Sequence, residues 1–170
     1  MRVAHGGLYV IMGVAGSGKS TIGAQLARAL GVEFAEGDDL HTPENVKRMA
    51  AGIALTDDDR RGWLLAIATR LSEAKRVGIG LVVSCSALKR SYRDLLRSRG
   101  DKDVRFVYLA GSPALLAERM AKRRGHFMPP SLLDSQLASL EEPSPDEHAW
   151  VCDIRDTPDT IVADLVNHAA

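Results

Sequence analysis

A glycine-rich segment near the start of the chain has the residue types and spacing of a phosphate-binding loop. Residues 13–20 read Gly-Val-Ala-Gly-Ser-Gly-Lys-Ser and match GxxxxGK[ST] at every fixed position. Glycines let the loop curl so that its N–H groups point inward toward phosphate oxygens. The lysine adds charge for the β- and γ-phosphates of a nucleoside triphosphate, and the final serine hydroxyl is a ligand for Mg²⁺. The predicted nucleotide-binding residues are Gly13, Val14, Ala15, Gly16, Ser17, Gly18, Lys19, Ser20 and Thr21.

Three carboxylates and an imidazole follow in the short segment Glu36–His41. They come where a second buried strand is expected to end, and the carboxyl ends of parallel strands open onto one ligand crevice. A kinase needs a carboxylate there to orient an acceptor hydroxyl and take its proton, with further help for Mg²⁺. The alternative is a solvent-exposed acidic turn ahead of a helix that begins after Pro43.

Two further groups of charged residues are candidates for binding anions. Lys89 and Arg93 are four residues apart, so on a helix they would share one face and could clamp an anionic acceptor. An ordinary surface helix is the alternative. The basic segment Lys122–Pro130 contains glycine and prolines and is either a solvated loop or a mobile lid over phosphates.

Other classes of phosphate-loop protein fit the sequence less well. A GTPase switch needs the guanine-reading pattern NKxD, which does not occur, and the DxxG match at Asp59–Gly62 follows no apolar strand. Motor and transporter ATPases usually need an acidic residue that ends a hydrophobic strand. Here the apolar run 81–83 continues into Ser84-Cys85-Ser86. These features favour a small kinase.

The elements expected to position these groups alternate between strand and helix. Continuous apolar runs are typical of strands that are buried on both faces of a parallel sheet. Between them, apolar residues recur at helical spacing, as in Ile22, Leu26 and Leu30 ahead of the helix-ending Gly31. The pattern predicts an α/β sheet with helices on both faces. The predicted strands are Leu8–Met12, Glu33–Glu36, Leu81–Val83, Phe106–Leu109 and Ala149–Cys152.

Length and composition indicate one domain spanning 1–170, with the lid at about 122–137. Lysine plus arginine equals aspartate plus glutamate at 22 each, so no net charge favours nucleic acid or a membrane. No apolar run approaches the roughly 18 residues of a membrane span. The two cysteines lie far apart and are interpreted as reduced thiols, so we expect a cytoplasmic protein.

Several separate signatures together resemble the gluconokinase family, and the likeness runs from the phosphate loop to about Glu147. The resemblance is carried by GDDLH at 37–41, DDDR at 57–60, CSALKRSYRDLLR at 85–97 and GHFMPPSLLDSQ at 125–136. It implies a P-loop NTPase fold with a five-stranded parallel sheet ordered 2-3-1-4-5, as in shikimate and nucleoside monophosphate kinases. It also implies a homodimer and ATP-dependent phosphorylation of D-gluconate to 6-phospho-D-gluconate.

The resemblance also implies roles for individual residues. Asp38 would orient the acceptor hydroxyl or act as its base, and Glu36 would lie near Mg²⁺ with Ser20. Glu36 departs from the family, which usually has aspartate there. The catalytic residues implied are Lys19, Asp38 and Arg123, with Arg119 and Arg123 at the nucleotide, and the substrate contacts implied are Asp38, His41, Lys89, Arg93, His126 and Gln136.

Two other functions stay open at this point. One is a kinase for another small hydroxy acid, related to shikimate, which the acceptor pocket would distinguish. The other is a nucleotide-binding regulator without catalytic activity. Lys19, Ser20, Asp38 and Arg123 are all present, and this argues against a loss of catalysis.

Overall fold

Five parallel strands form the centre of the protein. The computed structural model describes residues 6–123 and 130–169. The strand order is β2-β3-β1-β4-β5, which confirms the order that the family resemblance implied. β1 and β3 are buried along their whole length and β4 is buried except at its two ends, whereas the edge strands β2 and β5 are partly exposed. The strands are β1 (Leu8–Met12), β2 (Glu33–Glu36), β3 (Leu81–Ser84), β4 (Arg105–Ala110) and β5 (Trp150–Asp153).

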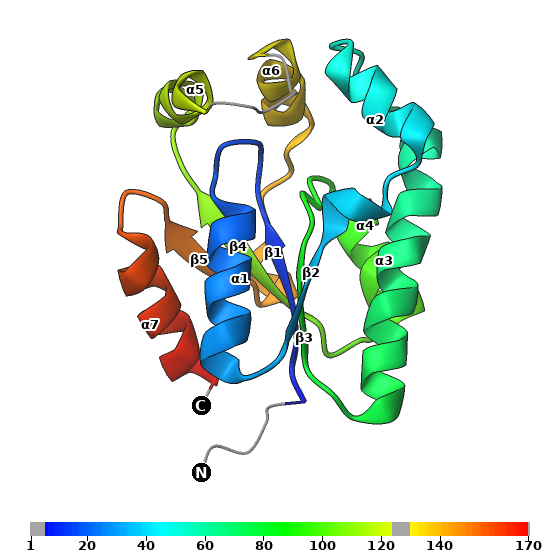
Figure 1. Cartoon of the computed structure of the whole chain (residues 1–170), viewed down its shortest axis with the longest axis vertical. Helices are drawn as coiled ribbons and strands as arrows, with labels where there is room; N and C mark the ends of the chain where they lie inside the picture. Colours follow the sequence, from blue (N-terminus) through cyan, green and yellow to red (C-terminus); the bar gives the residue numbers. More distant parts are fainter. Residues whose placement is uncertain (1–5, 124–129, 170) are drawn as a thin grey trace.

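Helices cover both faces of the sheet, as the sequence pattern predicted (Figure 1). Alternate residues of β1 face opposite layers: Val10 belongs to the core beneath α3 and α4, and Ile11 to the core beneath α1 and α7. This two-sided burial explains why the strand has a continuous apolar sequence. The covering helices are α1 (Lys19–Leu30), α3 (Asp57–Val77), α4 (Arg90–Leu95) and α7 (Pro158–Ala169).

Three more helices lie together at the carboxyl ends of the strands (Figure 1). They are α2 (Pro43–Ala50), α5 (Pro113–Lys122) and α6 (Pro130–Ser139). Short helical turns complete the fold at Gly37–Leu40, Leu96–Gly100 and Pro145–Glu147. The three helices therefore surround the end of the sheet where a parallel α/β fold binds its ligands.

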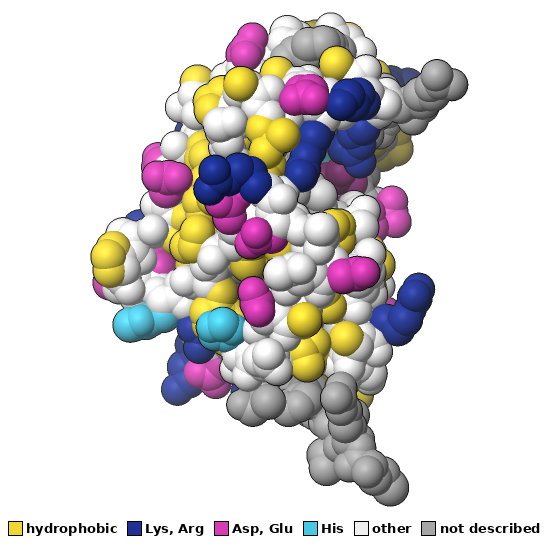
Figure 2. All heavy atoms as spheres, turned by 90° about the vertical axis from the view of Figure 1, so that its left-hand side faces the viewer, with side chains coloured by type: hydrophobic (Ala, Val, Ile, Leu, Met, Phe, Trp, Pro, Cys, Tyr) yellow, Lys and Arg dark blue, Asp and Glu magenta, His cyan; other side chains and the backbone are white. Residues whose placement is uncertain are grey.

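The outer face formed by α5, β5 and α7 carries acidic and basic side chains interspersed with apolar ones (Figure 2). Val151 on the edge strand is the most exposed large apolar residue among those described, at 64%. Within 6–123 and 130–169, no helix combines the length and apolarity needed to cross a membrane.

Candidate active site

The phosphate loop lies between β1 and α1, as the sequence predicted. The helix begins at Lys19, and the preceding Gly18 has φ of 96°, a left-handed conformation that glycine adopts without strain. Lys19 Nζ donates a hydrogen bond to the Val14 carbonyl at 3.1 Å, inside the loop. Burial lowers the pKa of Lys19, and the nearby Asp38 carboxylate opposes that shift. The Lys19 ammonium has lost most of its contact with water. A bound phosphate group would compensate for this loss by accepting charge-assisted hydrogen bonds from it.

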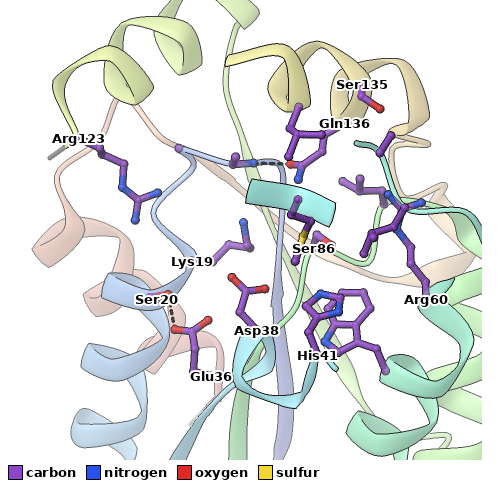
Figure 3. Close-up of a pocket in the computed structure, with 18 of the residues that line it drawn as sticks. Lys19, Ser20, Glu36, Asp38, His41, Arg60, Ser86, Arg123, Ser135 and Gln136 are labelled. Carbon is purple, nitrogen blue, oxygen red and sulfur yellow. Dashed lines mark hydrogen bonds between the residues drawn. The ribbon is translucent and has the colours of Figure 1, made fainter. Parts of the chain in front are cut away.

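One cavity, partly open to solvent, connects the phosphate loop with the acidic turn and the first turn of α3. Figure 3 shows Lys19, Ser20 and Arg123 at one end, and His41 and Arg60 at the other. The two ends match the two substrates of a kinase, a phosphoryl donor and an acceptor. The remaining lining includes Ala15, Gly16, Gly18, Glu36, Asp38, Met49, Ala54, Leu55, Trp63, Ser86, Leu88, Leu132, Ser135 and Gln136.

The acidic turn is brought to the phosphate loop by its close contact with β3. A Cβ added at Gly37 would lie 1.9 Å from the Ser84 carbonyl oxygen, so only glycine permits this approach. The Gly37 N–H donates to Ser84 Oγ at 3.1 Å. Asp38 then lies between Glu36 and His41 at the cavity wall (Figure 3). Of the residues that the sequence placed at this edge, the structure brings Glu36, Asp38 and His41 to the cavity, whereas Asp39 is exposed and does not line it.

Ser20 and Glu36, the two residues predicted to serve Mg²⁺, are in direct contact. The Ser20 hydroxyl donates a hydrogen bond to the Glu36 carboxylate, and the Ser84 hydroxyl donates to its other oxygen. Mg²⁺ prefers oxygen ligands and keeps several waters, so it needs few protein groups. In the described part of the chain, no three His, Cys, Asp or Glu side chains gather as a metal site. A hydroxyl and a carboxylate beside the phosphate loop fit Mg²⁺ held jointly with phosphate.

His41 is fixed against the indole ring of Trp63. The two ring centroids are 4.1 Å apart and the planes differ by 16°. Trp63 Nε1 donates to the Gly37 carbonyl at 2.8 Å, so the indole is itself anchored to the acidic turn. Burial and the positive charge of Arg60 lower the pKa of His41 to about 4. The imidazole is therefore neutral at physiological pH.

Among the residues that the structure describes, Arg60 is the cation at the acceptor end of the cavity, and our site prediction from the sequence missed it. It lies in the first turn of α3, and its Nη1 donates to the Tyr92 hydroxyl at 2.9 Å. The Tyr92 hydroxyl in turn donates to the Asp57 carboxylate. Asp57 and Arg60 both belong to the DDDR sequence. Arg60 also precedes Trp63 by about one helical turn, and this spacing could have indicated that the two side chains lie on the same face of the helix.

The predicted clamp of Lys89 and Arg93 is wrong. Lys89 is only the N-cap of α4, which begins at Arg90; its carbonyl accepts a hydrogen bond from the Arg93 N–H at 3.2 Å, but the two side chains do not face one ligand. Lys89 Nζ lies 3.1 Å from Asp57 Oδ1, and Lys89 does not line the cavity.

Arg93 is buried completely and cannot contact a ligand in this structure. Its guanidinium donates to both carboxylate oxygens of Glu147 at 2.7 and 3.0 Å and to the Ala87 carbonyl at 2.8 Å. Ala87 has φ of 46°, an uncommon conformation for a residue other than glycine. Arg93 therefore holds the turn between β3 and α4, which carries the cavity residues Ser86 and Leu88.

The residues predicted for the lid have different positions. Arg123 points into the cavity (Figure 3), whereas Arg119 donates to the Ile154 carbonyl at 2.6 Å outside it. Gln136 on α6 lines the cavity, and its Oε1 accepts a hydrogen bond from the Ala15 N–H at 2.7 Å. The predicted contact His126 lies outside the described residues.

This fold, with a phosphate loop open to an acceptor pocket, defines a P-loop kinase. A family model described as shikimate kinase matches residues 15–169. A gluconokinase from Gluconobacter oxydans is 47% identical over 159 residues, which cover 94% of this chain and 89% of that protein. A gluconokinase structure from Sinorhizobium meliloti has a TM-score of 0.86 and 48% identity, over 98% of this chain and 93% of the other. The chain belongs to the gluconokinase family.

A sugar kinase structure from a Janibacter species is similarly close. It has a TM-score of 0.90 and 46% identity, and the match covers 95% of this chain and 92% of that one. The thermoresistant gluconokinase of Escherichia coli is 39% identical over 160 residues, which cover 94% of this chain and 91% of that protein. The similarity therefore extends over nearly the whole chain and includes both ends of the cavity.

Proposed function

We propose that this protein is a gluconokinase, which transfers the γ-phosphoryl group of ATP to the 6-hydroxyl of D-gluconate. The products are 6-phospho-D-gluconate and ADP. The observation that carries the proposal is the continuous cavity from the phosphate loop to Arg60, with Asp38 between its ends. Gluconate carries a carboxylate at one end and the accepting hydroxyl at the other, so its two ends match Arg60 and Asp38.

The transfer step assigns distinct roles to the charged residues. The acceptor hydroxyl gives its proton to the Asp38 carboxylate while its oxygen forms a bond to the γ-phosphorus. The bond from that phosphorus to the bridging oxygen breaks, and its electrons leave with ADP. Lys19 and Arg123 neutralise the charge that spreads over the phosphoryl oxygens. Ser20 and Glu36 are the residues that would hold Mg²⁺, which supplies further charge neutralisation when it is bound.

The acceptor end offers the groups that a polyhydroxy acid needs. Arg60 provides the charge for the carboxylate, and the apolar cluster of Met49, Leu55 and Leu132 lines the cavity beside the carbon chain. His41, Ser86 and Gln136 also line the cavity and supply hydrogen-bonding groups for hydroxyls.

Replacing Arg60 with methionine is expected to raise the KM for gluconate by roughly 10- to 100-fold, the worth of a hydrogen bond to a charged group. The KM for ATP should change little. Steady-state kinetics with each substrate varied in turn measures both values. Arg61→Met is the matched control, because this neighbouring cation is exposed and does not line the cavity. A large rise in the gluconate KM for Lys89→Met, with none for Arg60→Met, would contradict the assignment.

We further propose that the segment at about 122–137 acts as a lid on the single domain. Arg123 at the end of α5 and Gln136 on α6 both line the cavity, and Gln136 contacts the phosphate loop. A lid in this position would exclude water, which would otherwise accept the phosphoryl group.

We also propose that Arg119, which lies beside the segment that follows β5, contacts the nucleotide. A cytoplasmic homodimer that uses Mg²⁺ is the form we propose for the working enzyme.

A further inference from the structure

His41 lines the cavity, and its Nδ1 lies close to the side chain of Asn45 of α2. Asn45 is buried, with 5% of its surface exposed. Its backbone N–H donates to the Thr42 hydroxyl, the cap of the helix, at 3.1 Å. Stacking on Trp63 fixes the plane of the His41 ring, and the cap fixes the start of α2. The two side chains therefore meet in a defined orientation.

The orientation of the Asn45 amide follows from its second partner. Asn45 Nδ2 lies 2.9 Å from the backbone carbonyl oxygen of Asp59, and a carbonyl can only accept a hydrogen bond. The atom that faces it must therefore be the amide nitrogen. The same nitrogen lies 3.4 Å from His41 Nδ1 and has a second hydrogen to offer. Nδ1 faces a donor, so it has to act as an acceptor and carry no proton.

We propose that Asn45 is a positioning residue that holds His41 as its Nε2–H tautomer, so that His41 donates a hydrogen bond to an acceptor hydroxyl oxygen and does not serve as the base. In a neutral imidazole, a proton-free Nδ1 requires the proton to be on Nε2. The identity of the acceptor rests on the proposed function, whereas the tautomer does not.

The Nε2–H tautomer of His41 limits which residue of the cavity can take the proton of the acceptor hydroxyl. The charged groups around His41 are Arg60 from α3, whose charge favours the neutral ring, and Asp38 from the same acidic turn. A ring that already carries hydrogen at Nε2 has no lone pair there for the proton of the acceptor. Glu36 accepts hydrogen bonds from two serine hydroxyls. Among the described residues that line the cavity, Asp38 is the carboxylate left for the proton.

Nitrogen NMR of the histidine rings tests the tautomer directly, without any substrate. Long-range proton–nitrogen spectra of the full chain at neutral pH distinguish a protonated from an unprotonated ring nitrogen. His41→Gln identifies the relevant signals among the five histidines. We expect His41 Nδ1 to be unprotonated and Nε2 to be protonated. A proton on Nδ1 in the wild type would overturn the proposal even if every Asn45 variant failed to fold.

Two isosteric replacements then test the role of Asn45. Asn45→Asp and Asn45→Leu both lose the bond to Asp59, but only the aspartate offers an acceptor to Nδ1. We expect a proton on Nδ1 in Asn45→Asp. In Asn45→Leu we expect the gluconate KM to rise by roughly 2- to 10-fold, as for the loss of one neutral hydrogen bond, with an unchanged KM for ATP.

Glu44→Gln is the matched control, because this neighbouring residue of the same helix is exposed and does not line the cavity. It should leave the His41 tautomer as in the wild type. An unprotonated Nδ1 in Asn45→Asp, or equal rises in both KM values in Asn45→Leu, would contradict the positioning role. Because the spectra need no substrate, a failure of gluconate as the acceptor would not be mistaken for a failure of this inference.

Discussion

Asp38→Asn is expected to lower kcat by about 10²- to 10⁴-fold, the usual worth of a positioned general base. The amide has nearly the same shape as the carboxylate but cannot take the proton of the acceptor hydroxyl. Nucleotide binding should be nearly intact, because Lys19 and the N–H groups of the phosphate loop are unchanged. Single-turnover kinetics, together with titration of ADP binding, measures the two effects separately.

Asp39→Asn is the control for this experiment. Asp39 is the next residue and also carries a carboxylate, but it is exposed and does not line the cavity. It should keep nearly full activity. If Asp38→Asn instead lost nucleotide affinity while transfer by the bound complex stayed fast, Asp38 would belong with the metal and phosphates. A residue other than Asp38 would then have to act as the base.

Glu147→Gln is expected to lower the free energy of unfolding by about 3–5 kcal/mol, because it leaves the buried Arg93 without its counter-charge. The side chains of Arg93 and Glu147 are 0% and 1% exposed, respectively. Denaturant-induced unfolding measures the change. The exposed pair of Arg90 and Asp146 is the control, and Asp146→Asn should have a much smaller effect. A negligible change for Glu147→Gln would contradict the structural role given to the pair.

The same pair predicts a pH dependence of stability. Burial raises the pKa of Glu147, but hydrogen bonds from Arg93 and the Ser144 N–H outweigh it and bring the pKa to about 2, below the ordinary 4.5. A carboxyl group with a depressed pKa stabilises the fold above its unfolded-state value and loses that contribution as the pH falls toward its folded-state value. The difference in stability between wild type and Glu147→Gln should therefore shrink between pH 4.5 and about 2.

The donor half of the site could be read from the sequence because its chemistry depends on the backbone of one short segment. Residues 13–20 carry the loop, the lysine and the serine together, and the flanking strand and helix patterns fix their place. The acidic turn was also predictable, since parallel strands deliver their carboxyl ends to one edge. The strand order came from the family resemblance and not from the apolar pattern.

The acceptor half was harder to predict because it is assembled from several elements. Lys89 and Arg93 suggested a clamp only on the assumption that both side chains share one helix face, but Lys89 is the N-cap of α4 and the Arg93 side chain is buried in the core. Local spacing gave no sign that Arg93 would pair with Glu147, which is 54 residues away. Arg60 and Asn45 were not assigned a role, because only the packing of α2 and α3 around the acidic turn shows what they contact.

A coupled assay of ATP-dependent ADP release over a panel of acceptors tests the central claim most directly. Gluconate, shikimate, glycerate and nucleoside monophosphates are each added to the same enzyme with ATP and Mg²⁺. We expect strong stimulation by gluconate and much weaker stimulation by the others, with 6-phospho-D-gluconate formed in an amount equal to the ADP. Equal stimulation by all of the acceptors, or none by gluconate, would contradict the assignment of this protein as a gluconokinase.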